Sequence, residues 1–148
     1  MKSSAILQKL MYFALDMDGT IYLGNKLLPG AKEFLDYLAA AGRKYVFLTN
    51  NSSKNKQSYV NKLQALGLAA KVDQILTSGE ATALYIKASN PNARIFLLGT
   101  ADLEQEFLSH GFTLTASVPD FVVLGFDQTL TYAKLTEACH LIREGVPL

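Results

Sequence analysis

Short runs of apolar residues alternate along the chain with longer stretches in which apolar residues recur every three or four positions. The short runs predict β-strands, and the recurring stretches predict amphipathic helices. The predicted strands cover residues 10–15, 45–48, 74–77, 94–98 and 121–126. The predicted helices cover residues 29–41, residues 80–88 and the stretches that end at Gly67, Gly111 and Gly145. This alternation indicates an α/β fold whose sheet is mainly parallel, with right-handed crossovers.

Polar residues and glycines mark where these elements begin and turn. Thr100 and Thr131 precede apolar stretches and are predicted helix N-caps, and Ser52 or Ser53 is the predicted cap of the second helix. The segment 22–28 is predicted to form a small hairpin with Gly24 and Asn25 at its tip.

Two further patterns predict burial. The run 10–15 is apolar without interruption, which is typical of a strand buried on both faces. In the last predicted helix four apolar residues share one face, which we expect to point inward: Tyr132, Leu135, Cys139 and Ile142.

Composition and charge narrow the class of protein. The 148 residues include 14 Lys and Arg against 13 Asp and Glu, a net charge of +1 that argues against nucleic acid or an anionic membrane surface as a partner. Apolar runs are far shorter than the roughly 20 residues of a membrane-spanning helix. Gln8 and Lys9 interrupt the N-terminal apolar residues, a poor secretory signal, and the lone Cys139 fits a reducing compartment. We therefore expect a cytoplasmic protein.

Two clusters of polar residues follow predicted buried strands. Asp16 and Asp18 come directly after the first strand, and Gly19 allows a sharp turn there. Carboxylates beside a buried strand end are costly unless a cation neutralises them, and Mg²⁺ is the natural candidate. The second cluster, residues 49–53, follows the second strand and supplies a hydroxyl, amides and backbone N–H groups at a predicted helix start, a good anion site. The alternative is purely structural: Asp18 caps a turn and a serine caps the helix.

These clusters resemble two motifs of the haloacid-dehalogenase-like (HAD) hydrolases: Asp16-Met-Asp-Gly-Thr20 the first, Leu48-Thr-Asn50 the second. The run from Asp18 to Gly24 and the later Val123-Leu-Gly-Phe-Asp127 are similar to the NagD-type, para-nitrophenylphosphatase branch. The resemblance covers about residues 12–145. It implies a Rossmann-like parallel core, of which residues 1–80 are the N-terminal part. Residues 81–148 would be the incomplete N-terminal part of an inserted α/β cap domain.

The resemblance also implies a mechanism. Asp16 would be the nucleophile that forms an aspartyl-phosphate, and Asp18 the general acid and base. Both would bind Mg²⁺, Asp16 through its carboxylate and Asp18 through its backbone carbonyl. Phosphate would be bound by a further set of residues: Gly19, Thr49, Asn50 and Asn51. The expected substrate is a small phosphorylated metabolite, with no nucleic acid or membrane partner.

The family's later lysine and second acidic pair have no counterpart in these 148 residues. We therefore expect the isolated chain to be weakly active or inactive, and an exposed sheet edge or the cap to favour a homo-oligomer. The alternatives are an inactive phosphate-binding or assembly fragment, and a phosphotransferase of the same superfamily. A signalling receiver is disfavoured because its acidic pair and acceptor aspartate lie on different strands.

The remaining polar residues have structural interpretations. His110 and His140 are isolated in the sequence, and His110 is expected at a helix end. Cys139 is expected in the core and Asp127 in a turn or cap. The lysines near the second helix are expected on a solvated face: Lys54, Lys56 and Lys62.

Overall fold

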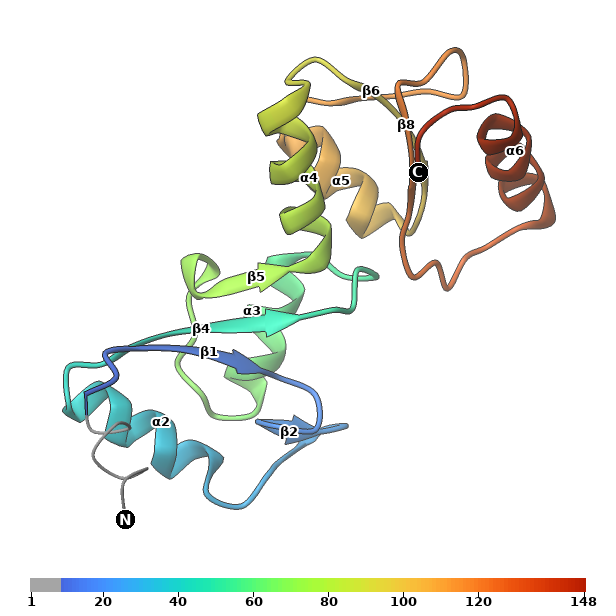
Figure 1. Cartoon of the computed structure of the whole chain (residues 1–148). Coiled ribbons are helices and arrows are strands. Elements are labelled where there is room, and N and C mark those ends of the chain that lie inside the picture. Colours follow the sequence, from blue (N-terminus) through green and yellow to red (C-terminus); the bar gives the residue numbers. More distant parts are fainter. Residues whose placement is uncertain (1–8) are drawn as a thin grey trace. The chain divides into compact units, whose positions relative to one another are not determined.

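The computed structural model describes residues 9–148, which form two compact units. The first unit consists of the described residues up to Thr49 together with Lys56–Leu76. The second consists of Asn50–Asn55 and Thr77–Leu148 (Figure 1). Each unit is an α/β structure, in agreement with the predicted fold class. The secretory-signal prediction concerns the N-terminal residues 1–9, and of these only Lys9 is among the described residues.

The first unit is built on a sheet with the strand order β1-β4-β5. Its strands are β1 (Tyr12–Asp16), β4 (Lys44–Thr49) and β5 (Ile75–Thr77). β1 and β4 run parallel, with a register that begins at Tyr12 opposite Lys44 and ends at Asp16 opposite Leu48. The hairpin predicted at residues 22–28 is present as β2 (Tyr22–Leu23) and β3 (Lys26–Leu27).

The helices of this unit are α2 (Ala31–Ala40), α3 (Lys56–Ala65) and the short 3₁₀ helix η1 (Val72–Gln74). α2 ends at Ala40, and Gly42 just beyond it has a φ of 66°, which lets the Arg43 N–H reach the Leu38 carbonyl at 2.9 Å. The core is formed by buried side chains from the strands, the hairpin and both α-helices: Met17, Tyr22, Leu35, Phe47, Tyr59 and Leu63 among them.

β1 departs from the prediction that it is buried on both faces, and that prediction is wrong. Tyr12 is 74% exposed, Ala14 and Asp16 are also exposed, and Phe13 and Leu15 are only half-buried. Among the described residues β1 has one neighbour in the sheet, β4, so it is an edge strand. An apolar run predicts strand structure reliably, but its burial depends on which neighbours cover it.

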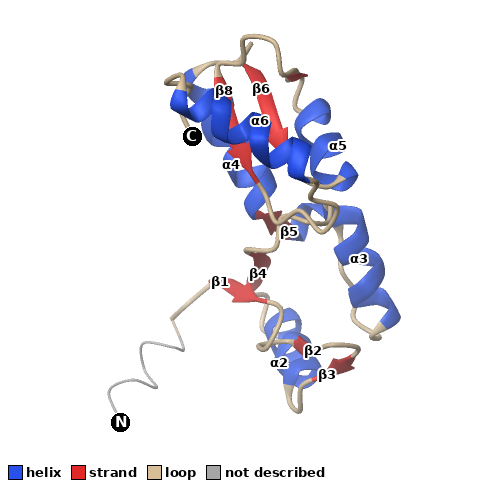
Figure 2. Cartoon of the chain, turned by 90° about the vertical axis from the view of Figure 1, so that its right-hand side faces the viewer, coloured by secondary structure: helices blue, strands red, loops and turns tan. Residues whose placement is uncertain are grey.

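The second unit is built on a parallel sheet with the order β7-β6-β8. Its strands are β7 (Thr113–Leu114), β6 (Arg94–Leu98) and β8 (Phe121–Leu124), of which β7 was not predicted from the sequence. Its helices are α4 (Ser78–Ser89), α5 (Ala101–Ser109) and α6 (Tyr132–Arg143). Alternate residues of β6 enter two separate clusters: Ile95 and Leu97 pack with α4 and α5, whereas Phe96 and Leu98 pack with α6. The sheet therefore has helices on both faces (Figure 2).

Three threonines cap the helices of this unit. The side chains of Thr77, Thr100 and Thr131 accept hydrogen bonds from the backbone N–H groups of Glu80, Leu103 and Lys134. The predicted caps at Thr100 and Thr131 are confirmed. The Thr77 cap starts α4 two residues before the predicted beginning of that helix.

Leu103 of α5 packs where three glycines meet. A Cβ on Gly79, Gly99 or Gly125 would lie 2.5, 2.7 or 2.4 Å from a Leu103 methyl group. Gly79 lies in the first turn of α4, while Gly99 and Gly125 directly follow β6 and β8. Because these three positions carry no side chain, the first turns of α4 and α5 and the ends of β6 and β8 can pack closely around the buried Leu103.

The predicted inward face of α6 is wrong. Ala138 and Leu141 are the buried residues of this helix, whereas Tyr132 is 85% exposed and Cys139 is also exposed. The helix carries apolar residues on two faces, so periodicity alone did not decide which face packs on the sheet. No helix of the described residues is both long enough and apolar enough to cross a membrane.

Candidate functional site

The first predicted cluster lies where β1 ends. Asp16 is the last residue of β1 and pairs in register with Leu48, and the residue after Leu48 is Thr49, the last of β4. Because β1 and β4 are parallel neighbours, Asp16 and Thr49 lie at the same edge of the sheet, on adjacent strand ends. The expected juxtaposition of the first motif with Thr49 is therefore present.

A tight turn after β1 presents both aspartates on the same side. Met17, which separates them, is fully buried, and its carbonyl accepts hydrogen bonds from the N–H groups of Ile21 at 2.9 Å and Tyr22 at 3.2 Å. Gly19 turns the chain with a φ of 83°. Since Met17 points into the core, the side chains of Asp16 and Asp18 face solvent.

Two groups of the predicted site, the Gly19 N–H and the Asp16 carboxylate, already form hydrogen bonds within the turn. The Gly19 N–H donates to the Tyr22 carbonyl at 2.7 Å, so a phosphoryl oxygen bound there would share that N–H. The Thr20 hydroxyl donates to Asp16 Oδ2 at 3.1 Å, which orients the carboxylate. Thr20 belongs to the first motif, although the sequence pattern alone indicated no role for it.

The structure contradicts the expectation that burial makes a cation necessary at the two aspartates. Asp16 and Asp18 are exposed, so burial does not force a counter-ion on them. Their donor chemistry still fits Mg²⁺, which binds through one or two carboxylates, keeps several waters and takes substrate phosphate oxygens. A metal bound here would be held, as the resemblance implies, by the Asp16 carboxylate and by the backbone carbonyl of Asp18.

Two buried tyrosines lie beside the aspartates. Burial, followed by the charges of Tyr59, Asp18 and Asp16, raises the pKa of Tyr22 to about 12. Burial also raises the pKa of Tyr59, opposed by a side-chain hydrogen bond with Thr49 and reinforced by Asp18. Both phenols are therefore neutral at pH 7. Tyr59, from α3, therefore contacts Thr49 and also lies close to Asp18. The sequence did not reveal this role, because a tyrosine at helical spacing is typical of a core residue.

Lys62 differs from its predicted place on a solvated helix face. It is half-buried, and its Nζ lies 3.9 Å from the centre of the Tyr22 ring. This cation–π contact brings a positive charge onto the tyrosine whose phenol is close to both aspartates.

Asn50 and Asn51, the other predicted phosphate ligands, begin the segment 50–55, which belongs to the second unit. Asn50 is exposed, and its carbonyl accepts the Ser78 hydroxyl at 3.0 Å. The Asn51 side-chain oxygen accepts the Ser53 N–H at 2.9 Å, which closes a turn.

The predicted caps at Ser52 and Ser53 are wrong. α3 begins at Lys56, so neither serine can serve its first turn. The Ser52 hydroxyl instead accepts the Phe126 N–H at 2.8 Å, and the Ser53 carbonyl accepts the Thr100 hydroxyl at 2.9 Å. The helix start expected to bind phosphate directly after Thr49 is thus a six-residue connection.

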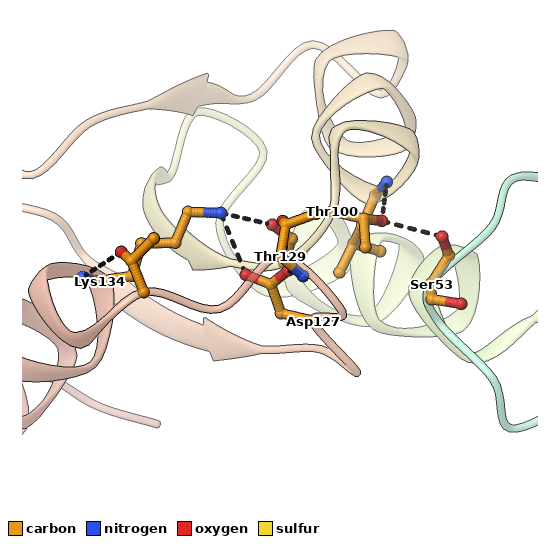
Figure 3. A network of polar contacts seen from close by, with 8 residues as sticks. Ser53, Thr100, Asp127, Thr129 and Lys134 are labelled. Carbon is orange, nitrogen blue, oxygen red and sulfur yellow. Dashed lines mark hydrogen bonds and ion pairs between the residues drawn. The ribbon is translucent and has the colours of Figure 1, made fainter.

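Asp127 has the predicted turn role. Its side chain is 1% exposed, and Oδ1 accepts the Thr129 N–H at 2.7 Å and the Thr129 hydroxyl at 2.6 Å. Oδ2 lies 3.0 Å from Lys134 Nζ, which also donates to the Gly99 carbonyl at 3.0 Å (Figure 3). Burial opposes ionisation, but these hydrogen bonds and the ion pair together hold the pKa of Asp127 below its usual value.

His110 is not isolated as the sequence suggested. Its Nε2 lies 3.3 Å from Glu106 Oε1 one turn earlier in α5, and its place at the C-terminal end of that helix is confirmed. Glu80 of α4 completes a half-buried group whose ligand atoms lie within 4.8 Å of one another. Within residues 9–148 it is the one such group of three acidic, histidine or cysteine side chains, and it does not include Asp16 or Asp18.

Comparisons with known proteins identify the family of the chain. Residues 13–113 match the family model of the haloacid dehalogenase-like hydrolases, and the chain belongs to this family. It is 35% identical over 134 residues to an acid sugar phosphatase of Staphylococcus saprophyticus, a match that covers 90% of this chain and 52% of the relative.

Solved structures place the chain in the NagD and 4-nitrophenylphosphatase branch of the family. A 4-nitrophenylphosphatase from Thermotoga maritima superposes with a TM-score of 0.92 at 48% identity, over 95% of this chain and 54% of that one. A glycerol phosphate phosphatase from Mycobacterium tuberculosis, in complex with magnesium, superposes with a TM-score of 0.87 at 29% identity, over 95% of this chain and 44% of that one. The chain thus spans about half the length of these relatives.

Proposed function

We propose that this protein hydrolyses phosphomonoesters in a magnesium-dependent reaction, through an aspartyl-phosphate on Asp16. The observation that carries the proposal is the parallel register of β1 and β4, which brings Asp16 and Thr49 to adjacent strand ends. The hydrogen bond from Thr20 to Asp16 and the contact of Tyr59 with Thr49 support it, because they order the two residues from within the same unit.

In the proposed reaction a carboxylate oxygen of Asp16 attacks phosphorus, and the bond from phosphorus to the alcohol oxygen breaks. Asp18, protonated at the start, gives its proton to that oxygen. Asp18 then takes a proton from a water molecule, which attacks the phosphorus, releases inorganic phosphate and restores the Asp16 carboxylate. Thr49, Gly19, Asn50 and Asn51 would bind the phosphoryl oxygens. Bound Mg²⁺ would offset the repulsion between the anionic nucleophile and the anionic substrate.

The proposed substrate is a small phosphorylated metabolite, and Mg²⁺ is the proposed cofactor. The names of the relatives refer to an acid sugar phosphatase and to a glycerol phosphate phosphatase in complex with magnesium, which supports both choices. We further propose that residues 1–80 are the N-terminal part of the catalytic core and that residues 81–148 are the N-terminal part of an inserted cap. The cytoplasm remains the proposed compartment, on the sequence evidence alone.

A second candidate is phosphate binding without turnover by these 148 residues. The observation that favours it is the donor set: within the described part of the chain, no third acidic, histidine or cysteine ligand joins Asp16 and Asp18 in a compact group. Such a site could bind Mg²⁺ and phosphate weakly, yet lack part of the charge needed for hydrolysis.

One experiment separates these candidates. The chain, the variant Asp16→Asn and the matched control Asp36→Asn, which alters an exposed aspartate of α2, are assayed with Mg²⁺ and para-nitrophenyl phosphate. Hydrolysis that Asp16→Asn abolishes and Asp36→Asn keeps supports the phosphatase. Magnesium-dependent binding of inorganic phosphate without hydrolysis, lost in Asp16→Asn alone, supports the second candidate. Equal hydrolysis by all three proteins contradicts the role of Asp16.

A further inference from the structure

The segment 50–55 connects β4 to α3 in the sequence, but it is held by residues that follow much later. Hydrogen bonds join it to other parts of the second unit. They link the Ser78 hydroxyl to the Asn50 carbonyl, the Phe126 N–H to the Ser52 hydroxyl, the Thr100 hydroxyl to the Ser53 carbonyl, and the Asn55 N–H to Asp102 Oδ2. Their lengths run from 2.8 to 3.2 Å. These contacts reach across the sequence, so no local pattern in residues 50–55 could reveal them.

The contact between Ser52 and Phe126 depends on the glycine that precedes Phe126. A Cβ on Gly125 would lie 3.1 Å from Ser52 Oγ, closer than an ordinary contact, and 2.4 Å from a Leu103 methyl group. The Gly125 N–H donates to the Leu98 carbonyl at 2.8 Å, which continues the pairing of β8 with β6. The missing side chain at Gly125, just after β8, therefore leaves room for the Ser52 hydroxyl.

The first turn of α5 holds the segment at two points. Thr100, which is 9% exposed, donates its hydroxyl hydrogen to the Ser53 carbonyl and accepts the Leu103 N–H at 3.4 Å as the helix cap. Asp102, two residues further, accepts the Asn55 N–H. Gly99, which precedes Thr100, is held by Lys134 and through it by Asp127 (Figure 3).

We propose that Ser52 and Thr100 are positioning residues: by holding the backbone of residues 50–55, they set the phosphate affinity of Asn50 and Asn51. This inference rests on the proposed function, in which these asparagines bind the phosphoryl group. The physical reason is entropic. Ordering the backbone of an irregular segment costs conformational entropy, and a segment that is already ordered before binding does not incur this cost when the ligand arrives.

The test compares two pairs of variants. Ser52→Ala removes the acceptor of the Phe126 N–H, and its matched control is Ser109→Ala, at the exposed end of α5 in the same unit. Thr100→Val removes both hydrogen bonds of that hydroxyl, and Thr100→Ser keeps the hydroxyl. Two quantities are measured for each: amide hydrogen exchange in residues 50–55 and at Phe126, and the affinity for inorganic phosphate with Mg²⁺ by titration calorimetry.

We expect Ser52→Ala and Thr100→Val to speed exchange in the segment and to weaken phosphate binding about fivefold, the equivalent of one hydrogen bond. Ser109→Ala and Thr100→Ser should match the unsubstituted chain in both measurements. Phosphate affinity that Ser52→Ala and Thr100→Val keep in full overturns the inference, whether or not exchange changes, and leaves the proposed function standing. An unsubstituted chain that binds no phosphate overturns both.

Discussion

Asp16 lies opposite Leu48 in the parallel register of β1 and β4, one residue before Thr49. This pairing brings Asp16 and Thr49, two residues of the proposed site, to one edge of the sheet, because adjacent parallel strands end side by side. Met17 points into the core between the two aspartates, while Asp16 and Asp18 remain exposed. An exposed acidic pair beside a hydroxyl suits a site that opens to a charged substrate.

Stability at high pH should depend on Tyr22. Its pKa is raised to about 12, whereas a tyrosine in the unfolded chain titrates near 10. The unfolded state therefore loses its proton first, so stability is fully present below pH 10 and falls as pH rises toward 12. Tyr22→Phe should flatten the decline in the free energy of unfolding above pH 10, by an amount on the order of 2 kcal/mol across that range.

Urea unfolding between pH 9 and pH 12, a range that spans the unfolded tyrosine pKa of about 10 and the raised value of about 12, measures this effect. Tyr85→Phe, at a highly exposed tyrosine of α4, is the matched control and should leave the slope unchanged. Parallel pH profiles for Tyr22→Phe and the unsubstituted chain would contradict the raised pKa.

Gly125→Ala should destabilise the second unit. The added Cβ would meet Leu103 Cδ2 at 2.4 Å and Ser52 Oγ at 3.1 Å, so side chains in a packed region would have to move. We expect a loss of about 1–3 kcal/mol in the free energy of unfolding. Leu103→Ala makes room, so the cost of Gly125→Ala should be smaller in that background. Additive costs in this double-mutant cycle would show that Leu103 is not the residue that excludes a side chain at position 125.

Lys134→Met should destabilise the chain by about 1–3 kcal/mol near pH 7, because it leaves the Asp127 carboxylate buried without its cation. Arg143→Met, on the same helix, is the control and should have little effect. The pKa of Asp127 is lowered, so its contribution is present above the unfolded value and disappears as pH falls through the folded value. The cost of Lys134→Met should therefore shrink in acid, and a cost independent of pH would argue against the ion pair.

Local signals in the sequence predicted much of the fold. β6 was predicted with the observed bounds, and the caps at Thr100 and Thr131 were recognised, because each depends on a few neighbouring residues. The hairpin at Tyr22–Leu27 followed in the same way from the turn signal at Gly24 and Asn25.

The errors concern partners that are distant in the sequence. The burial of β1 depends on strands beside it, and the packed face of α6 depends on which of two apolar stripes meets the sheet. Ser52 seemed to be a helix cap because its partner, Phe126, lies 74 positions away. In the candidate site, the two sequence motifs pointed to Asp16 and Thr49. The contact of Tyr59 with Thr49 could not be predicted, because it forms only when α3 packs beside β4.

The most direct test of a phosphate site at the ends of β1 and β4 is an amide chemical-shift map of the chain on addition of Mg²⁺ and inorganic phosphate. We expect the largest changes at residues 16–20 and 49–51, and their loss in Asp16→Asn but not in Asp36→Asn. Changes centred on Glu80, Glu106 and His110, or none at the two strand ends, would contradict the assignment.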